Sequence, residues 1–108
     1  ERLFAKEVDR DSNGCLQDVH WYAGLFGYFP TYSLGALTAA QIASQVRKDI
    51  NNLDQQIEKG NFNELIKWLK LNIHSKASLY SSNEILQQVT NSELNAKYFM
   101  DYIKNRYL

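Results

Sequence analysis

The sequence has 108 residues, of which 44% are hydrophobic, and its twelve basic and twelve acidic residues cancel to a formal net charge of zero. This length allows one modest core and argues against two independent domains, so we expect a single region over residues 1–108. The balanced charge, without a long basic block, argues against a nucleic-acid surface. No apolar run approaches the roughly 20 residues that cross a bilayer, so no membrane association is expected. Cys15 is the only cysteine, which excludes an internal disulfide and favours a reducing, cytoplasmic setting.

Two irregular segments come first in the chain. Residues 7–18 are expected to form a loop, because residues 9–14 are a cluster of turn formers. Residues 20–32 then hold six of the 14 aromatic residues, namely Trp21, Tyr22, Phe26, Tyr28, Phe29 and Tyr32. Composition alone favours an aromatic loop that plugs the core.

A long helix is predicted over residues 31–49. Its apolar residues recur at helical spacing and are Leu34, Leu37, Ile42, Val46 and Ile50. Pro30 fits the first turn, because its fixed φ and missing N–H cost nothing there. Small residues such as Ala36 and Ala40 lie beside the apolar ones, so a partner helix that approaches closely is expected.

The remainder of the sequence predicts shorter helices. One covers residues 53–59 and is stopped by Gly60. Capping arrangements at residues 61–64, 81–84 and 90–93 precede further apolar segments. The buried face of the helix after Asn61 is expected to consist of Phe62, Leu65, Ile66, Leu69 and Ile73. No alternating run is long enough for a sheet, so the fold class is all-α.

The most specific pattern is Gly-x-x-Gln-Asp-x-His-Trp at residues 14–21, which leads into Phe-Gly-Tyr-Phe-Pro-Thr-Tyr-x-Leu-Gly at residues 26–35. This signature, residues 14–35, resembles the C-terminal signature of thermostable carboxypeptidases of the carboxypeptidase Taq type. The resemblance implies the C-terminal segment of an all-helical zinc metallocarboxypeptidase, with an aromatic active-site loop before a long helix. The zinc motif of that family, His-Glu-x-x-His, lies far upstream of the signature and is absent from this sequence. The resemblance thus implies no metal site and no cofactor in this chain, and zinc or another divalent metal in the full-length parent.

The resemblance also suggests roles for individual residues. A lone histidine is usually structural, but in related zinc peptidases a His and Tyr pair stabilises the oxyanion that develops on the substrate carbonyl. We therefore assign His20 and Tyr32 to that role, with Tyr28 as the second choice for the phenol. Asp18 is expected to hold the imidazole through one ring nitrogen.

Gln17, Asp18 and Trp21 are candidate substrate-binding residues. Gln17 can bind a peptide backbone or tie down its loop, and Trp21 can wall a groove or fill the core. Cys15 resembles no nucleophile and is expected to be a small buried hydrophobe.

The expected function is the C-terminal part of an enzyme that removes C-terminal amino acids from peptides. Its expected partners are the peptide substrate, the N-terminal remainder of the same protein and a second copy in a homodimer. This chain alone is predicted to be inactive. The alternative is a non-catalytic helical interaction module derived from such an enzyme. An autonomous metal enzyme is ruled out by the two histidines and one cysteine, which lack metal-ligand spacing.

Overall fold

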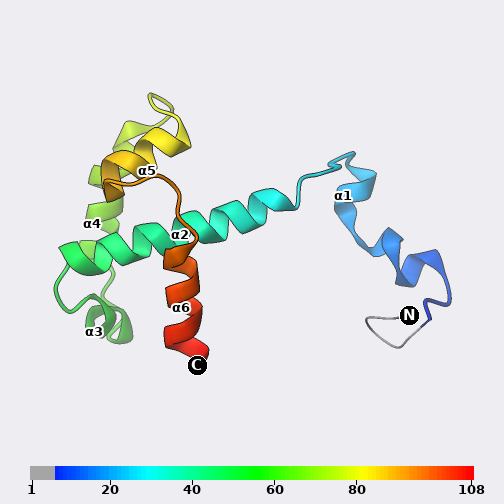
Figure 1. Cartoon of the computed structure of the whole chain (residues 1–108), viewed down its shortest axis with the longest axis horizontal. Helices are drawn as coiled ribbons and strands as arrows, with labels where there is room; N and C mark the ends of the chain where they lie inside the picture. The colour runs from blue at the N-terminus through cyan, green and yellow to red at the C-terminus, as the bar shows by residue number, and fades with distance from the viewer. Residues whose placement is uncertain (1–6) are drawn as a thin grey trace. The chain divides into compact units, whose positions relative to one another are not determined.

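A computed structural model describes residues 7–108, and the charged start of the sequence, residues 1–6, lies outside it. The described part contains helices and no strand (Figure 1), which confirms the all-α prediction. The chain divides into two compact units with the boundary between Tyr32 and Ser33. Our expectation of a single region over residues 1–108 stays a prediction. The elements in chain order are η1 (Asp11–Asn13), η2 (Cys15–Gln17), α1 (Val19–Tyr22), α2 (Pro30–Asp49), α3 (Leu53–Glu58), α4 (Asn63–Asn72), η3 (His74–Lys76), α5 (Ser82–Thr90) and α6 (Lys97–Tyr107).

The first unit is more ordered than the plain loop predicted for residues 7–18. The 3-10 turns η1 and η2 occupy that range, and the side chain of Asn13 closes the first of them by donating to Asp9 Oδ1 at 2.8 Å. After α1, Gly24 and Gly27 adopt φ values of 70° and 75°. These left-handed conformations favour glycine, and they turn the chain from α1 toward the start of α2.

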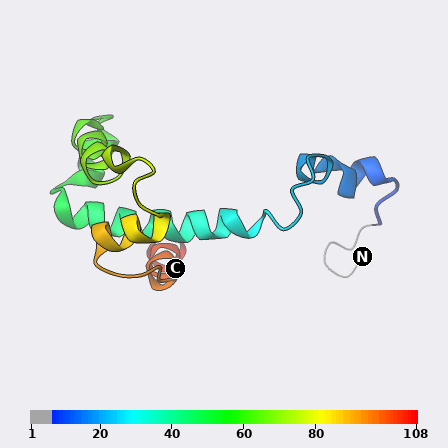
Figure 2. The same ribbon diagram turned by 90° about the horizontal axis from the view of Figure 1, so that it is seen from above.

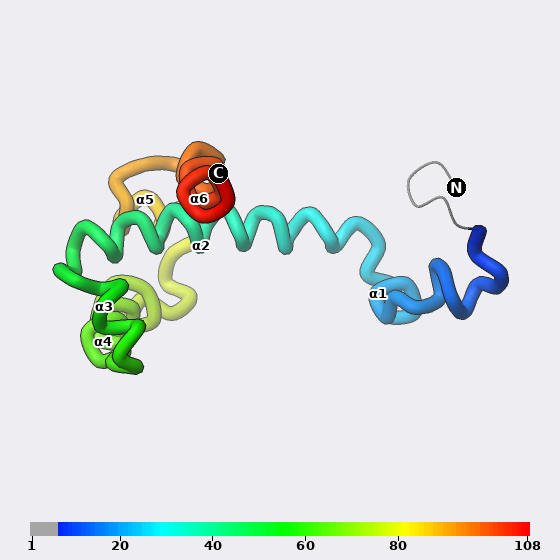
Figure 3. Tube along the Cα trace, turned by 90° about the horizontal axis from the view of Figure 1, so that it is seen from below, coloured from blue at the N-terminus to red at the C-terminus, as the bar shows by residue number. Residues whose placement is uncertain are grey.

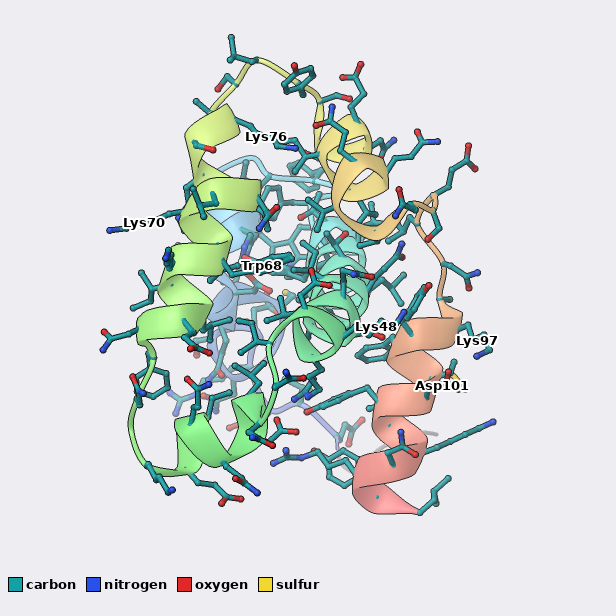
Figure 4. All side chains as sticks on the ribbon, turned by 90° about the vertical axis from the view of Figure 1, so that its left-hand side faces the viewer. Lys48, Trp68, Lys70, Lys76, Lys97 and Asp101 are labelled. Atoms are coloured by element: carbon teal, nitrogen blue, oxygen red, sulfur yellow. The ribbon has the colours of Figure 1, made fainter. Side chains whose placement is uncertain are left out.

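The long helix α2 begins at Pro30, one residue before the predicted start, and ends at Asp49 as predicted. Within the second unit it is the element around which the others are arranged. Figures 2 and 4 show α3 and α4 on one side of it and α5 and α6 on the other. Figure 1 shows α6 roughly perpendicular to α2, and Figure 3 shows it end-on beside α2.

A small apolar core lies where α2, α3 and α4 meet. Its buried residues are Val46, Ile50 and Leu53, with Ile42, Leu65 and Trp68 packed against them. Trp68 points from α4 toward α2 (Figure 4), and its Nε1 donates to Asp49 Oδ2 at 2.9 Å. An indole N–H at a core edge needs such a partner.

The buried face predicted for α4 was partly wrong. Phe62 and Ile66 are 45% and 47% exposed, whereas Leu65 and Trp68 pack against the core. The helix begins at Asn63, so Phe62 precedes its first turn. The predicted face included only aliphatic residues and phenylalanine. It therefore omitted Trp68, which defines the inward face of the helix.

The three predicted capping arrangements had different outcomes. At the start of α5, Ser81 and Glu84 form a complete capping box, as predicted. Before α4, Asn61 Oδ1 accepts from the N–H of Asn63 at 3.2 Å, but Glu64 Oε2 accepts from the side chain of Gln56 at 2.7 Å. That prediction was wrong for the reciprocal half, because a tertiary partner takes the carboxylate.

The prediction of a capping box at residues 90–93 was wrong, because the polar side chains of that segment bond to a buried glutamine. Gln41 is 0% exposed, and its Nε2 donates to Thr90 Oγ1 at 2.9 Å and to Ser92 Oγ at 2.8 Å. Its Oε1 accepts from the backbone N–H of Asn95 at 2.9 Å. The segment after α5 is therefore tied to α2, and α6 begins only at Lys97.

The small residues of α2 face a groove in the second unit. Ala36, Ala39, Ala40 and Ala43 line it from α2, and Tyr98 and Tyr102 are among the residues that line it from α6. Helix α6 therefore provides part of the partner that the sequence predicted for the small-residue face of α2. Nearer the start of α2, Leu34 is 50% exposed. Within residues 7–108, no helix is both long and apolar enough to span a membrane.

Candidate functional site

Asp18 links the second 3-10 turn to helix α1. Its Oδ1 accepts a hydrogen bond from the backbone N–H of His20 at 2.8 Å, as an N-cap side chain does. The same oxygen lies 2.7 Å from Nδ1 of the His20 ring. One carboxylate oxygen therefore caps the helix and holds the imidazole, as the sequence predicted for Asp18.

The charge of Asp18 decides which atom of this contact carries the proton. Hydrogen bonds from the backbone N–H of His20 and then from its ring lower the pKa of the Asp18 carboxyl below its ordinary value of 3.8. At neutral pH the group is ionised and accepts hydrogen bonds only. Nδ1 of His20 must therefore be the donor.

The other ring nitrogen of His20 contacts Tyr32. Nε2 lies 2.9 Å from the Tyr32 hydroxyl, although 12 residues separate the two in the sequence. The His20 side chain is 21% exposed, whereas Tyr32 is 56% exposed. The structure thus brings together the two residues that we assigned to oxyanion stabilisation, with the phenol on the outer side.

Two aromatic rings also pack against the imidazole. Tyr28 stacks on His20 with ring centroids 5.6 Å apart, and Phe29 lies at 4.9 Å. Tyr28 also meets the ring of Tyr32 edge-on at 5.4 Å. Phe29 had no predicted role, although its position beside Tyr28 in the signature was a signal for one. These contacts restrict rotation of the His20 ring.

The candidate substrate-binding residues border a shallow hollow. Its lining consists of Gly14, Cys15, Gln17, Asp18, Val19, His20 and Trp21. Trp21 is 45% exposed and packs against Phe26 at 5.3 Å between ring centroids. Cys15 is exposed, so the expectation of a buried hydrophobe was wrong: the 3-10 turn places it at the surface. Binding of a peptide by Gln17 or Trp21 stays a prediction.

The site does not contain a set of metal ligands. Among residues 7–108, no group of three or more His, Cys, Asp or Glu side chains is placed to hold a metal ion. A structural or catalytic zinc ion needs three or four protein ligands, whereas this site offers one imidazole already bound to a carboxylate and a phenol.

Solved structures that resemble this chain include those of carboxypeptidases. Trypanosoma cruzi metallocarboxypeptidase 1 superimposes with a TM-score of 0.85 at 39% sequence identity, over 97% of this chain and 22% of that one. The profile of the carboxypeptidase Taq (M32) metallopeptidases matches residues 1–107. The chain belongs to this family.

Curated relatives agree with this assignment. Thermostable carboxypeptidase 1 of Pyrococcus furiosus is 37% identical over 108 residues, which are 100% of this chain and 22% of the relative. Carboxypeptidase 1 of Bacillus subtilis is 39% identical over 97 residues, which are 90% of this chain and 19% of the relative. The chain therefore spans about a fifth of the length of the curated relatives it matches. The predicted resemblance is confirmed at the level of the family.

Proposed function

We propose that this chain forms the C-terminal part of a zinc carboxypeptidase and stabilises the substrate carbonyl during removal of a C-terminal amino acid. The observation that supports this role is the His20–Tyr32 contact of 2.9 Å. It lies inside the signature, in a chain of a family described as metallopeptidases. The relatives named as carboxypeptidases provide the reaction class.

The chemistry proposed for the site is donation of hydrogen bonds to a developing oxyanion. A hydrolysed peptide bond passes through a tetrahedral state in which negative charge collects on the former carbonyl oxygen. Donors that are already oriented toward that position lower the barrier, because no reorganisation is needed as the charge forms. Asp18 holds His20 and His20 holds Tyr32, so the Tyr32 phenol is oriented in advance as the donor and His20 acts on the oxyanion through it.

The other candidate residues are proposed to shape the substrate groove. Tyr28 lies against both His20 and Tyr32 and is the second choice for the donating phenol. Gln17 and Trp21 border the hollow beside His20 and are proposed to contact the peptide.

The described residues do not fit a metal site, so zinc ligands would have to come from another part of the polypeptide. When bound, zinc would supply a Lewis acid that polarises the scissile carbonyl. The N-terminal remainder of the protein is accordingly a proposed partner. A cytoplasmic location and a homodimer are further proposals, drawn from the single cysteine and from the exposed apolar residues.

A pair of matched peptides tests the proposed reaction. The protein at its natural length is incubated with a peptide and with the same peptide amidated at its C-terminus, and released amino acids are measured. A carboxypeptidase releases the last amino acid from the free acid, and it cleaves the amide far more slowly because the terminal carboxylate is missing. His20→Ala should abolish most of the release without unfolding the protein.

Two outcomes would contradict the proposal. Equal cleavage of the acid and the amide would identify a different peptidase specificity. A folded protein of natural length that cleaves neither peptide, with zinc supplied, would favour the non-catalytic helical interaction module instead.

A further inference from the structure

The proton positions around His20 follow from the chemistry of its two neighbours. The ionised Asp18 carboxylate accepts only, and its Oδ1 lies 2.7 Å from Nδ1. The alternative tautomer would place the Nδ1 lone pair against a negatively charged oxygen at that distance, which is repulsive. Nδ1–H is therefore the donor in both protonation states of the ring.

In the neutral ring this leaves Nε2 with a lone pair. The hydroxyl of Tyr32, 2.9 Å away, is the only member of that contact with a hydrogen to give. Tyr32 then donates to His20, and the phenol presents only its oxygen lone pairs to a substrate. The two residues proposed to donate to an oxyanion are in this state bonded to each other.

In the imidazolium the same contact reverses direction. Nε2–H donates to the Tyr32 oxygen, and the phenol hydrogen becomes free to point outward. Tyr32 is 56% exposed, so its hydrogen can reach a ligand at the surface. The reversal requires no movement of heavy atoms.

We propose that Asp18 is a positioning residue that sets the direction of the His20–Tyr32 hydrogen bond, so that protonation of His20 switches Tyr32 from an acceptor toward substrate into a donor. This inference deepens the proposed function and, for its catalytic meaning, rests on it. Among residues 7–108, the titratable groups that contact His20 are Asp18 at the start of α1, Tyr28 in the following loop and Tyr32 in the first turn of α2. Phe29 is the uncharged neighbour.

Nuclear magnetic resonance of the protein labelled with 15N-histidine tests the proton positions directly. Above the pH at which His20 becomes neutral, its Nδ1 should resonate in the protonated range and its Nε2 in the unprotonated range. His74 lies outside the site in η3 and provides the internal reference. A neutral His20 with the proton on Nε2 would overturn the proposal.

Two variants of Asp18 distinguish the effect of its acceptor oxygen from the effect of its negative charge. Asp18→Ala should move the neutral ring to the Nε2–H form, because the acceptor for Nδ1–H is lost. Asp18→Asn should retain the Nδ1–H form, because the backbone N–H of His20 keeps the amide oxygen turned toward the site. An unchanged tautomer in Asp18→Ala, or a switched one in Asp18→Asn, would contradict the positioning role. If Asp18→Ala does not fold, the wild-type tautomer and Asp18→Asn still decide the question.

The switch itself is read from Tyr32. With 13C-labelled tyrosine, the resonance of the Tyr32 carbon that bears the hydroxyl should shift with the same midpoint as the His20 nitrogens, and this shift should vanish in Asp18→Ala. A Tyr32 resonance that does not shift when His20 is protonated would overturn the switch. Because these readouts need no turnover, an inactive protein with the expected tautomer refutes only the proposed function, and an active one with the opposite tautomer refutes only this inference.

Discussion

Nε2 of His20 lies 2.9 Å from the hydroxyl of Tyr32, across 12 residues of sequence that include two glycine turns. The contact joins the second residue of a four-residue helix to the first turn of a twenty-residue one. Neither helix could form it by its own periodicity. The loop between them, with Gly24 and Gly27 at positive φ, creates the relationship on which the proposed chemistry depends.

If the proposed carboxypeptidase activity holds, replacement of Tyr32 by phenylalanine in the natural-length protein should lower the turnover number more than it changes the Michaelis constant. The phenol is assigned to charge that appears mainly in the transition state, and loss of one such donor costs about 10²-fold to 10³-fold in turnover. Tyr22→Phe is the matched control, because that phenol donates to the carbonyl of Leu16 at 2.8 Å and not to His20. Steady-state kinetics on both variants would check this. If Tyr32→Phe kept full turnover, the role would pass to Tyr28 or be discarded.

Gln41→Leu should destabilise the second unit. The glutamine is 0% exposed and accepts from the N–H of Asn95 at 2.9 Å in a part-buried hydrogen bond, so leucine would leave that donor without its partner. Such a loss costs about 1–3 kcal/mol in the free energy of unfolding. Denaturant unfolding monitored by circular dichroism measures the change. Gln45→Leu, one turn further along α2, removes only an exposed bond to Asp49 and should have a smaller effect; equal effects would contradict the importance of burial.

The capping box of α5 should weaken in acid. Hydrogen bonds from the side chain and backbone of Ser81 lower the pKa of Glu84 below its ordinary value of 4.5. Because the folded pKa is the lower one, the ionised form adds stability that is complete above about pH 4.5 and is lost as pH falls through the folded pKa. The difference in unfolding midpoint between wild type and Glu84→Gln, measured from pH 7 down to pH 3, should stay constant and then shrink. A difference that grows in acid would have the wrong sign.

The 108-residue chain by itself should self-associate. Leu34 on α2 is 50% exposed, and in the first unit Phe26 and Val19 are 71% and 66% exposed. Exposed apolar surface of this kind is usually covered by another protein surface, most often in a symmetric dimer. Sedimentation velocity at micromolar concentration should show a dimer or a larger species. Leu34→Lys should weaken the association more than Ser33→Lys does, and a monomer without dye-accessible apolar surface would refute the expectation.

The same chain by itself should not cleave peptides and should bind zinc no better than an unrelated protein with two histidines. The reason is that its only histidine within the candidate site already uses both ring nitrogens. Isothermal titration with zinc and an assay of amino-acid release would check this. Cleavage that persists through repurification and disappears in His20→Ala would contradict it.

Local sequence signals predicted the features that depend on neighbouring residues. Pro30 and the apolar spacing after it predicted α2 to within one residue, and Ser81 with Glu84 predicted a capping box that forms in full. Asp18 lies two positions before His20, so its hold on the imidazole could also be inferred from the chain alone. The signature at residues 14–35 was specific enough to indicate the family, which the profile match confirms.

Only the tertiary structure determined the features in which residues far apart in the sequence compete for the same hydrogen-bond partner. Thr90 and Ser92 form a capping pattern in the sequence, yet the buried amide of Gln41 takes both side chains, because an amide removed from water must be fully hydrogen-bonded. The face of α4 that points inward depends on Trp68, whose indole N–H donates to Asp49 on α2. The meeting of His20 with Tyr32 likewise depends on a loop geometry that residue spacing does not encode, since contacts between segments are determined by packing and turns and not by local propensity.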